Sequence, residues 1–283
     1  MKFLIQTING EIRHDFTFTL LESIRFKKWI TNNKCDIKVK FIDYIETVEP
    51  SDIYPIQFKS YHEKYVPVGS VEFVSDFIHH FYGLYVKPIN VPEELFNHPS
   101  WDFTKRKIFN GTHMSLENKA GKFFVKSNDQ IKYFTEVVEC KDIGNTGTLY
   151  SVPIPVGNHQ ISEYLNGIES EWRAFVYDGK LVGLQNYCGD FTKFPNVNII
   201  KEMIKTYRSA PIAYTLDIGV GDGMFDSKRG FFLGNETFVI EVHDFFSCGL
   251  YGFADHTIYP KMLHNWFWQY IQREIVEQRR DKV

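Results

Sequence analysis

Two carboxylates stand inside stretches of the sequence that are otherwise apolar. Asp217 lies within AYTLDIGV (213–220), and Glu241 lies within TFVIEVHDFF (237–246). The β-branched and aromatic residues around them predict buried strands, where an isolated ionised acid is strongly disfavoured. Two such acids predict a cation shared between the strands, and therefore a metal-dependent enzyme. The alternative is that one acid points to solvent and the other pairs with an arginine.

Basic residues elsewhere could complete a site for phosphate chemistry. Lys126 ends the strand-like run FFVK, and Lys132 follows the polar turn after it. Glu171 and Arg173 alternate onto one face of a strand, and 163–165 could form an extended linker. Cations for phosphate oxygens and carboxylates for Mg²⁺ are the parts that nucleotide phosphoryl transfer requires. Gly219, Gly221 and Gly223 fit no phosphate-binding glycine motif, so we expect a flexible loop over 219–235.

The elements that must position these residues are both helices and strands. MKFLIQTI, LLESIRFKKWI and CDIKVKFIDYI predict a strand, a helix and a strand, and the prolines of PINVPEEL predict a boundary near residue 95. Asp178-Gly179 predicts a hairpin turn. A helix follows in NVNIIKEMIKTYRS, and its apolar face is expected to contain Ile199, Met203, Ile204 and Tyr207. KMLHNWFWQYIQREIVEQ predicts a closing helix.

The composition excludes several classes of protein. The chain has 283 residues with 43% hydrophobic content and a net charge of -3, so bulk charge gives no reason to expect nucleic acid or an anionic membrane as partner. Its four cysteines form no metal-binding or disulfide pattern. Because no signal-peptide core or membrane-length apolar run is present, we expect a cytoplasmic protein that makes no membrane contact.

The order of the parts resembles the ATP-grasp superfamily: a lysine strand, a hinge, a Glu-x-Arg strand, a helix, an acid strand and a final Glu-containing strand. More narrowly, VPVGSVEFV, FFVKSNDQIKYFTEVVE, SEWRAFVYDGKLVG and VIEVHDFFSCGLYGF are similar to small ATP-grasp proteins of phages and bacteria. The resemblance covers roughly residues 65–255. It implies an α+β fold with an α/β domain at 1–95 and two subdomains, 96–160 and 161–283, that clamp ATP.

The resemblance also implies roles for individual residues. Lys126 and Lys132 would contact the ATP phosphates. The segment 161–165 matches the adenine hinge, which makes Glu163, Tyr164 and Leu165 nucleotide-binding residues. Glu163 or Glu171 would meet the exocyclic amine or the ribose. Arg173, like Lys126, would be catalytic, placed near the transferred phosphate and the acyl-phosphate oxygens.

Asp217 and Glu241 match the family's Mg²⁺ ligands, but the next position departs from the family pattern. Family members usually carry Asn two residues after the metal-binding Glu, and this chain has His243. Imidazole is a poorer Mg²⁺ ligand than oxygen, so either Asp244 substitutes, or Mn²⁺ is tolerated, or the second metal is weakly held. Lys105, Arg106 and Lys107 are the candidates for the upstream lysine of other ATP-grasp enzymes.

The function that the resemblance implies is an ATP-dependent carboxylate-amine ligase that uses Mg²⁺ and an acyl-phosphate intermediate. Its substrates would be small-molecule or peptide carboxylates and amines. Lys193, in YCGDFTKF, is expected to be an exposed loop residue, with a contact to the substrate carboxylate as the alternative. The alternative function is an ATP-binding assembly, chaperone-like or regulatory protein without ligase turnover, since EWRAFV also resembles an ATP-grasp assembly chaperone.

Overall fold

The computed structural model describes residues 1–44, 58, 61, 63–99, 102–129, 131, 133–144, 147–221, 225–226, 231–232 and 236–280. By its internal contacts the chain divides into two compact units, which interleave along the sequence. The first comprises Met1–Val86, Ala210–Tyr214 and Asp244–Val283, and the second comprises Lys87–Ser209 and Thr215–His243. The division at residues 95 and 160 stays a prediction. Among the described helices, none has the length and apolar character needed to cross a membrane.

The first unit contains a parallel three-stranded sheet. In spatial order its strands are β2 (Lys38–Asp43), β1 (Lys2–Thr7) and β3 (Val66–Val68). Phe3, Leu4 and Ile5 of β1 are fully buried, which is why this central strand reads as a continuous apolar run. The helix α1 (Asp15–Ile30) connects β1 to β2. The predicted strand, helix and strand are confirmed.

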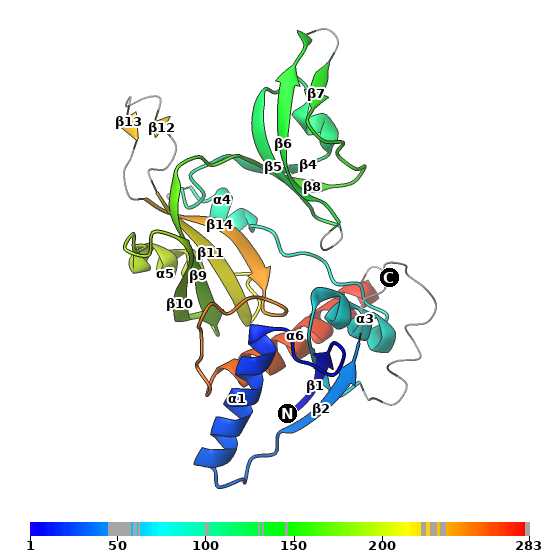
Figure 1. Ribbon diagram of the computed structural model, residues 1–283. Coiled ribbons are helices and arrows are strands. Elements are labelled where there is room, and N and C mark those ends of the chain that lie inside the picture. Colours follow the sequence, from blue (N-terminus) through cyan, green and yellow to red (C-terminus); the bar gives the residue numbers. More distant parts are fainter. Residues whose placement is uncertain are drawn as a thin grey trace. The chain divides into compact units, whose positions relative to one another are not determined.

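Two further helices among the described residues belong to this unit. Ser70 caps α3 (Val71–Tyr82) by accepting a hydrogen bond from the amide of Phe73 at 3.1 Å. The closing helix α6 (Tyr259–Arg280) contacts α1 and β3, and Figure 1 shows α6 beside α1. The Tyr259 hydroxyl donates a hydrogen bond to the backbone carbonyl of Phe16 at 3.1 Å. Residues after 243 are therefore part of the same core as the first helix of the chain.

The second unit contains an antiparallel five-stranded sheet (Figure 1). In spatial order its strands are β4 (Ile108–Gly111), β8 (His159–Glu163), β5 (Gly121–Ser127), β6 (Thr135–Asp142) and β7 (Thr148–Tyr150). The short helices α4 (Glu93–Phe96) and η1 (His113–Leu116) precede and follow β4. Leu116, Phe123, Val125, Val138 and Ile161 belong to one apolar core.

A four-stranded sheet lies mainly in the second unit. In spatial order its strands are β10 (Lys180–Gly189), β9 (Ile168–Tyr177), β11 (Ala213–Gly221) and β14 (Glu236–Asp244). Asp178 and Gly179 both have positive φ, 50° and 67°, so the hairpin turn predicted between β9 and β10 is confirmed. A separate two-stranded ribbon pairs β12 (Phe225–Asp226) with β13 (Phe231–Phe232).

The helix α5 (Val197–Thr206) contacts β10. It confirms the predicted helix, with one change in the apolar face. Ile200, Met203 and Ile204 are its buried residues, whereas Ile199 is only half-buried. The periodicity of 3.6 residues per turn therefore located the face to within one residue.

The expectation that Gly219 and Gly221 lie in a flexible loop is wrong, because both residues belong to the buried strand β11. A Cβ atom on Gly219 would come within 2.3 Å of the Phe238 ring, and one on Gly221 would come within 2.1 Å of the Gly167 carbonyl oxygen. These glycines therefore allow close packing of neighbouring segments. Gly223 lies outside the described residues.

Candidate active site

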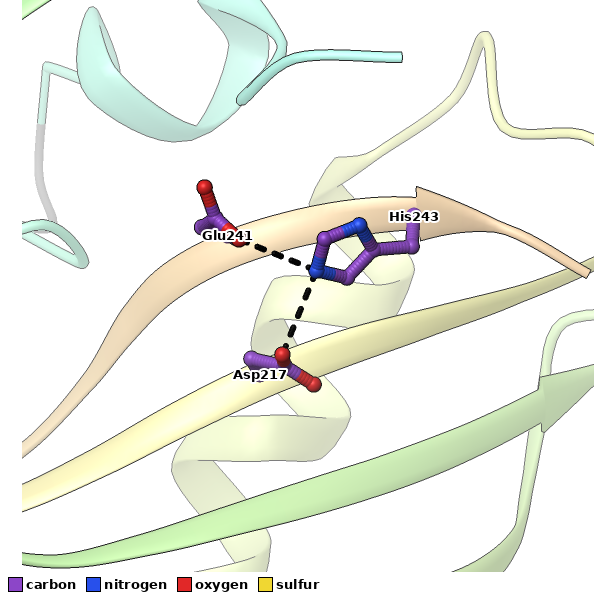
Figure 2. Close-up of side chains that lie close together, drawn as sticks. All are labelled: Asp217, Glu241 and His243. Carbon is purple, nitrogen blue, oxygen red and sulfur yellow. Dashed lines mark ion pairs between the residues drawn. The ribbon is translucent and has the colours of Figure 1, made fainter. Parts of the chain in front are cut away.

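Asp217, Glu241 and His243 meet on one face of the four-stranded sheet (Figure 2). Asp217 comes from β11 and the other two from the adjacent strand β14, where a spacing of two residues places Glu241 and His243 on the same face. The Nε2 atom of His243 lies 3.2 Å from Oδ2 of Asp217 and 3.0 Å from Oε2 of Glu241. The sequence-predicted pair of acids is therefore brought together, with the imidazole between them.

Arg173 forms a two-pronged ion pair with Asp217. Its Nε and Nη2 atoms each donate a hydrogen bond of 2.8 Å, to Oδ1 and Oδ2 respectively. Both side chains are buried, and β9 lies next to β11 in the sheet. One acid thus has the arginine partner that the alternative interpretation of the two acids expected. That alternative also expected the other acid to point to solvent. Glu241 instead faces His243 and Lys126.

The hydrogen bonds in this cluster outweigh the effect of burial on ionisation. Burial acts to raise the pKa of Asp217, but hydrogen bonds from Arg173 and His243 lower that pKa to about 2. Burial also opposes ionisation of Glu241, whose pKa is nevertheless lowered by His243 and Lys126. For His243, burial lowers the pKa, while the bonds to both carboxylates raise it overall. The chain itself therefore keeps both acids ionised.

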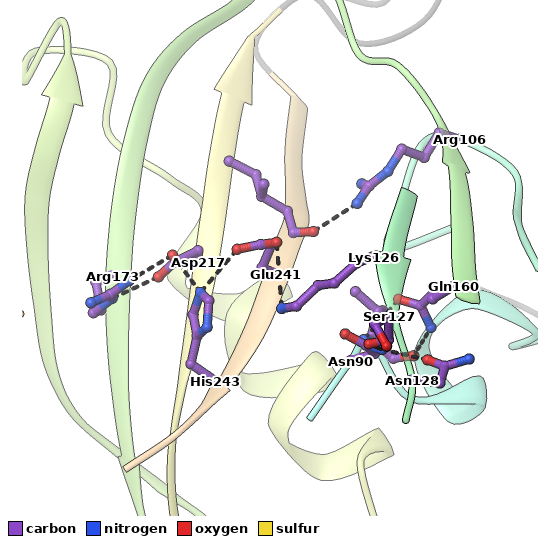
Figure 3. A network of polar contacts seen from close by, with 12 residues as sticks. Asn90, Arg106, Lys126, Ser127, Asn128, Gln160, Arg173, Asp217, Glu241 and His243 are labelled. Carbon is purple, nitrogen blue, oxygen red and sulfur yellow. Dashed lines mark hydrogen bonds and ion pairs between the residues drawn. The ribbon is translucent and has the colours of Figure 1, made fainter. Parts of the chain in front are cut away.

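Lys126 approaches the same cluster from the end of β5. Its Nζ atom lies 3.6 Å from Oε1 of Glu241 (Figure 3). The predicted phosphate-binding lysine and the predicted metal-binding acid are thus neighbours, although they come from different sheets of the second unit. Lys132, the second predicted phosphate-binding residue, lies outside the described residues.

A cavity of about 310 Å³ adjoins Glu241. Its walls include the predicted hinge residues Glu163, Tyr164 and Leu165, together with apolar side chains from three strands. Those apolar side chains are Phe124, Ile168 and Ile240. The volume is at the lower end of the range for small-molecule sites, and apolar walls with a few polar groups are typical of them. The cavity therefore has the size and lining of a small-molecule site next to Glu241.

Glu163 and Glu171, which the sequence could not distinguish, occupy different surroundings. Glu163 lines the cavity, and its Oε2 accepts a hydrogen bond from the backbone amide of Lys107 at 3.0 Å. Glu171 is not among the residues that line the cavity, and its Oε2 accepts a hydrogen bond of 2.7 Å from the Tyr187 hydroxyl. Of the two glutamates, Glu163 is therefore the one that lines the cavity.

Tyr187 is a site residue that sequence reasoning missed. Besides bonding Glu171, its ring lies 5.7 Å from the Cζ atom of Arg173, within the range of a cation–π contact. Burial raises the pKa of Tyr187 well above its ordinary value, and the nearby Asp217 carboxylate adds to the effect. The tyrosine therefore stays neutral and holds Glu171 and Arg173 on one face of the sheet.

Of the three consecutive basic residues 105–107, Arg106 is the one beside the cavity. Its Nη1 and Nη2 atoms donate hydrogen bonds of 2.8 and 2.7 Å to the backbone carbonyls of Val239 and Ile240. Burial lowers the pKa of Arg106 to about 10. Lys105 instead pairs with Glu236 at 3.0 Å, and the side chain of Lys107 is exposed. Among the three candidates for the upstream cation, Arg106 alone lines the cavity.

Two further predicted residues lie apart from the cluster. Asp244 points to the opposite face of β14 from His243, and its Oδ1 accepts a hydrogen bond from the Trp266 indole at 3.0 Å. Lys193 pairs with Glu169 at 3.2 Å, and its backbone carbonyl accepts a hydrogen bond from Trp172 at 3.1 Å. Lys193 is therefore tied to β9, although its side chain remains partly exposed.

The sheets and the site define an ATP-grasp protein, and the comparison of families agrees. The model of the ATP-grasp domain, R2K clade family 2, matches residues 103–261, which is more than half of the chain. The chain belongs to this family. The resemblance noted in the sequence and the predicted α+β ATP-grasp fold are both confirmed.

Solved structures similar to this chain include a D-alanine–D-alanine ligase from Bacillus anthracis, at 12% identity over 97% of this chain and 99% of that chain, with a TM-score of 0.47. The ATP-grasp ligase PsnB complexed with minimal precursor is 12% identical over 93% and 99%, with a TM-score of 0.46. N5-carboxyaminoimidazole synthetase from Staphylococcus aureus is 12% identical over 86% and 71%, also with a TM-score of 0.46. Among curated proteins the search found no match.

Proposed function

We propose that the protein is an ATP-dependent ligase that joins a carboxylate to an amine. The observation that carries the proposal is the arrangement around Glu241. This carboxylate lines the cavity that the predicted hinge residues border, Lys126 lies 3.6 Å from it, and His243 links it to the Arg173–Asp217 pair. Cations for phosphate oxygens, carboxylates for a divalent metal and a pocket for a base are the parts of a phosphoryl-transfer site. Membership in an ATP-grasp family supports the same conclusion.

The proposed reaction has two balanced steps. The γ-phosphoryl group of ATP passes to an oxygen of the substrate carboxylate, which gives an acyl phosphate and ADP. The amine then attacks the acyl carbon, loses a proton and expels inorganic phosphate, leaving an amide. Lys126 and Arg173 would hold phosphate and acyl-phosphate oxygens, where their positive charge stabilises the charge that develops. The substrates we propose are small-molecule or peptide carboxylates and amines.

A divalent metal fits the donor atoms of the cluster. Asp217 and Glu241 supply carboxylate oxygens, and the candidate ligand atoms of these residues and His243 all lie within 4.8 Å of one another. Asp217 and Glu241 would hold the ion. When bound, the ion would neutralise part of the phosphate charge. The chain's own contribution is to keep both acids ionised and to position Lys126 and Arg173 beside them.

The ligase proposal is tested by ADP release. The full chain is incubated with ATP, divalent metal and pooled amino acids, alongside Glu241→Gln, which keeps the shape of the side chain but removes its charge. ADP release by the wild type that falls at least about a hundredfold in the variant supports the proposal, since metal-site carboxylates are worth several kcal/mol of transition-state stabilisation. Equal ADP release by both proteins overturns the assigned site, and no release by either overturns ligation of these substrates.

The second candidate function is ATP binding without turnover, in an assembly or regulatory role. It is favoured by one observation, namely that both oxygens of Asp217 are already engaged by Arg173. Thermal unfolding distinguishes the two functions. Saturation with ATP at about 100 times its dissociation constant adds roughly 2.7 kcal/mol of stability. That shift without ADP release from any acid and amine pair favours the binding role.

A further inference from the structure

The position of His243 bears on which metal the cluster selects. Its Nε2 atom lies 3.0 Å from a Glu241 oxygen and 3.2 Å from an Asp217 oxygen. Ligand atoms at right angles around an ion with bonds of about 2.1 Å are themselves about 3 Å apart. In this arrangement Nε2–H donates a hydrogen bond to each carboxylate. A shared ion would take the place of that proton, with Nε2 as its third ligand beside the two carboxylates.

Among the described His, Cys, Asp and Glu residues, the cluster contains no third carboxylate that could take the place of this nitrogen. Asp244, the nearest carboxylate along the chain, faces the other side of β14 and accepts the Trp266 indole hydrogen bond. Asp217 is also a weaker ligand for a metal ion, because each of its oxygens already accepts a hydrogen bond from Arg173. The donor set is thus one carboxylate engaged by an arginine, one carboxylate paired with a lysine, and one imidazole.

Ions differ in how well they accept such a set. Mg²⁺ demands oxygen ligands in near-ideal octahedral geometry and gives up its water reluctantly. First-row transition ions accept imidazole nitrogen readily, and Mn²⁺ is the member of that series that also prefers carboxylate and phosphate oxygens. A mixed set of two carboxylates and one imidazole next to a phosphate site therefore favours Mn²⁺.

We propose that His243 is a metal ligand and makes this a nitrogen–oxygen centre that binds Mn²⁺ in preference to Mg²⁺. The proposal rests on the proposed ATP-metal site and specifies its ion. It assigns the specificity to one side chain, so replacing that side chain by one with an oxygen donor changes the preference without removing the site.

The first experiment measures metal affinity directly in the full chain, without turnover. Mn²⁺ and Mg²⁺ are titrated in the presence of ADP into the wild type, His243→Asn and the control His264→Asn, whose ring contacts its neighbour Asn265 on α6. We expect the ratio of Mn²⁺ to Mg²⁺ affinity to fall at least about tenfold in His243→Asn, the size of effect seen when metal-ligand surroundings are altered. The control should match the wild type. An unchanged ratio in His243→Asn overturns the proposal.

The second experiment asks whether the nitrogen bonds the ion. Pulsed electron paramagnetic resonance of bound Mn²⁺ detects a directly coordinated nitrogen, and ¹⁵N labelling of the protein with unlabelled ADP shows that the nitrogen belongs to the chain. We expect a ¹⁵N coupling in the wild type and none in His243→Asn. Mn²⁺ bound with no protein nitrogen coupling overturns the proposal, even if the ligase assay succeeds. A coupling without ADP release would instead leave this proposal standing and count against ligation.

Discussion

At the scale of single residues, the charges of the site are balanced by the chain itself. Asp217 has Arg173 as a buried partner, and Glu241 has Lys126 at 3.6 Å. A nucleotide that takes up the two cations would release the two carboxylates for a metal, because each group then exchanges one partner of opposite charge for another. Metal and nucleotide should therefore favour each other's binding.

Replacing Lys126 by Met should change the affinities for ATP and for Mn²⁺ in opposite directions. We expect Lys126→Met to lose at least about tenfold in ATP affinity, since one hydrogen bond to a charged group is worth roughly 1.5–3 kcal/mol. The same variant should bind Mn²⁺ alone more tightly, because Glu241 no longer has a cation of the chain beside it. Calorimetric titration of ATP and of Mn²⁺ measures both, with Lys141→Met on the exposed face of β6 as the control. A parallel loss of both affinities would contradict the exchange of partners.

Replacing Arg173 by Met should destabilise the fold. Removing one partner of a buried ion pair leaves the other charge uncompensated, and we expect a loss of about 3 kcal/mol in the free energy of unfolding. Urea denaturation measures this loss. Arg25→Met is the matched control, because the Arg25–Glu22 pair is on the surface and should contribute less than about 1 kcal/mol. If both variants lose the same small amount, the Arg173–Asp217 pair does not stabilise the protein.

At the scale of elements, the order of strands in the four-stranded sheet assembles the site. β11 lies between β9 and β14, so its acid meets the arginine of one neighbour and the glutamate and histidine of the other. β10 carries Tyr187 to Glu171, with irregularities in its pairing with β9 between residues 181 and 183 and between 186 and 188. The exact fit of β11 against β14 depends on Gly219, whose missing side chain makes room for Phe238.

Gly219→Ala should therefore disturb both packing and site. A methyl group 2.3 Å from the Phe238 ring cannot be accommodated unless the ring or β14 shifts. We expect a loss of about 1–3 kcal/mol in the free energy of unfolding, as for other overpacked cores. Urea denaturation is the measurement, and the double variant Gly219→Ala/Phe238→Leu should recover part of the loss. No recovery in the double variant would place the cause somewhere other than this contact.

At the scale of the whole molecule, the two units are interleaved along the chain. The first unit takes its core from the N-terminal residues and from Asp244–Val283 together. Asp15 accepts a hydrogen bond from the amide of Leu250, and α1 contacts α6. The apolar side chains of α1, among them Leu20 and Ile24, are buried in a core that the first 95 residues do not complete by themselves.

The fragment 1–95 should consequently fail to fold alone. Without α6 it exposes apolar surface whose burial stabilises small domains, and we expect a circular dichroism spectrum with little helix and no cooperative thermal transition. Addition of a fragment comprising 244–283 should restore part of the helical signal. A cooperative transition in 1–95 alone would show that the predicted N-terminal domain is autonomous.

The sequence by itself determined the elements and part of the site, because these depend on local pattern. The apolar runs located β11 and β14, the Asp-Gly pair located the hairpin, and a spacing of two placed Glu241 and His243 on one face of a strand. The family followed from the order of these parts, and the match over residues 103–261 confirmed it.

Only the tertiary structure decided which cation stands beside which acid. Arg173 could have reached several partners until the strand order placed β9 next to β11, and Arg106 lines the cavity because its guanidinium binds carbonyls 133 and 134 residues away. The placement of Tyr187 depends on irregular pairing between β10 and β9, which shifts the register by a residue. No periodicity in the sequence reveals this shift. Contacts between residues distant in the chain are set by packing, whereas strands and turns are set by neighbouring residues.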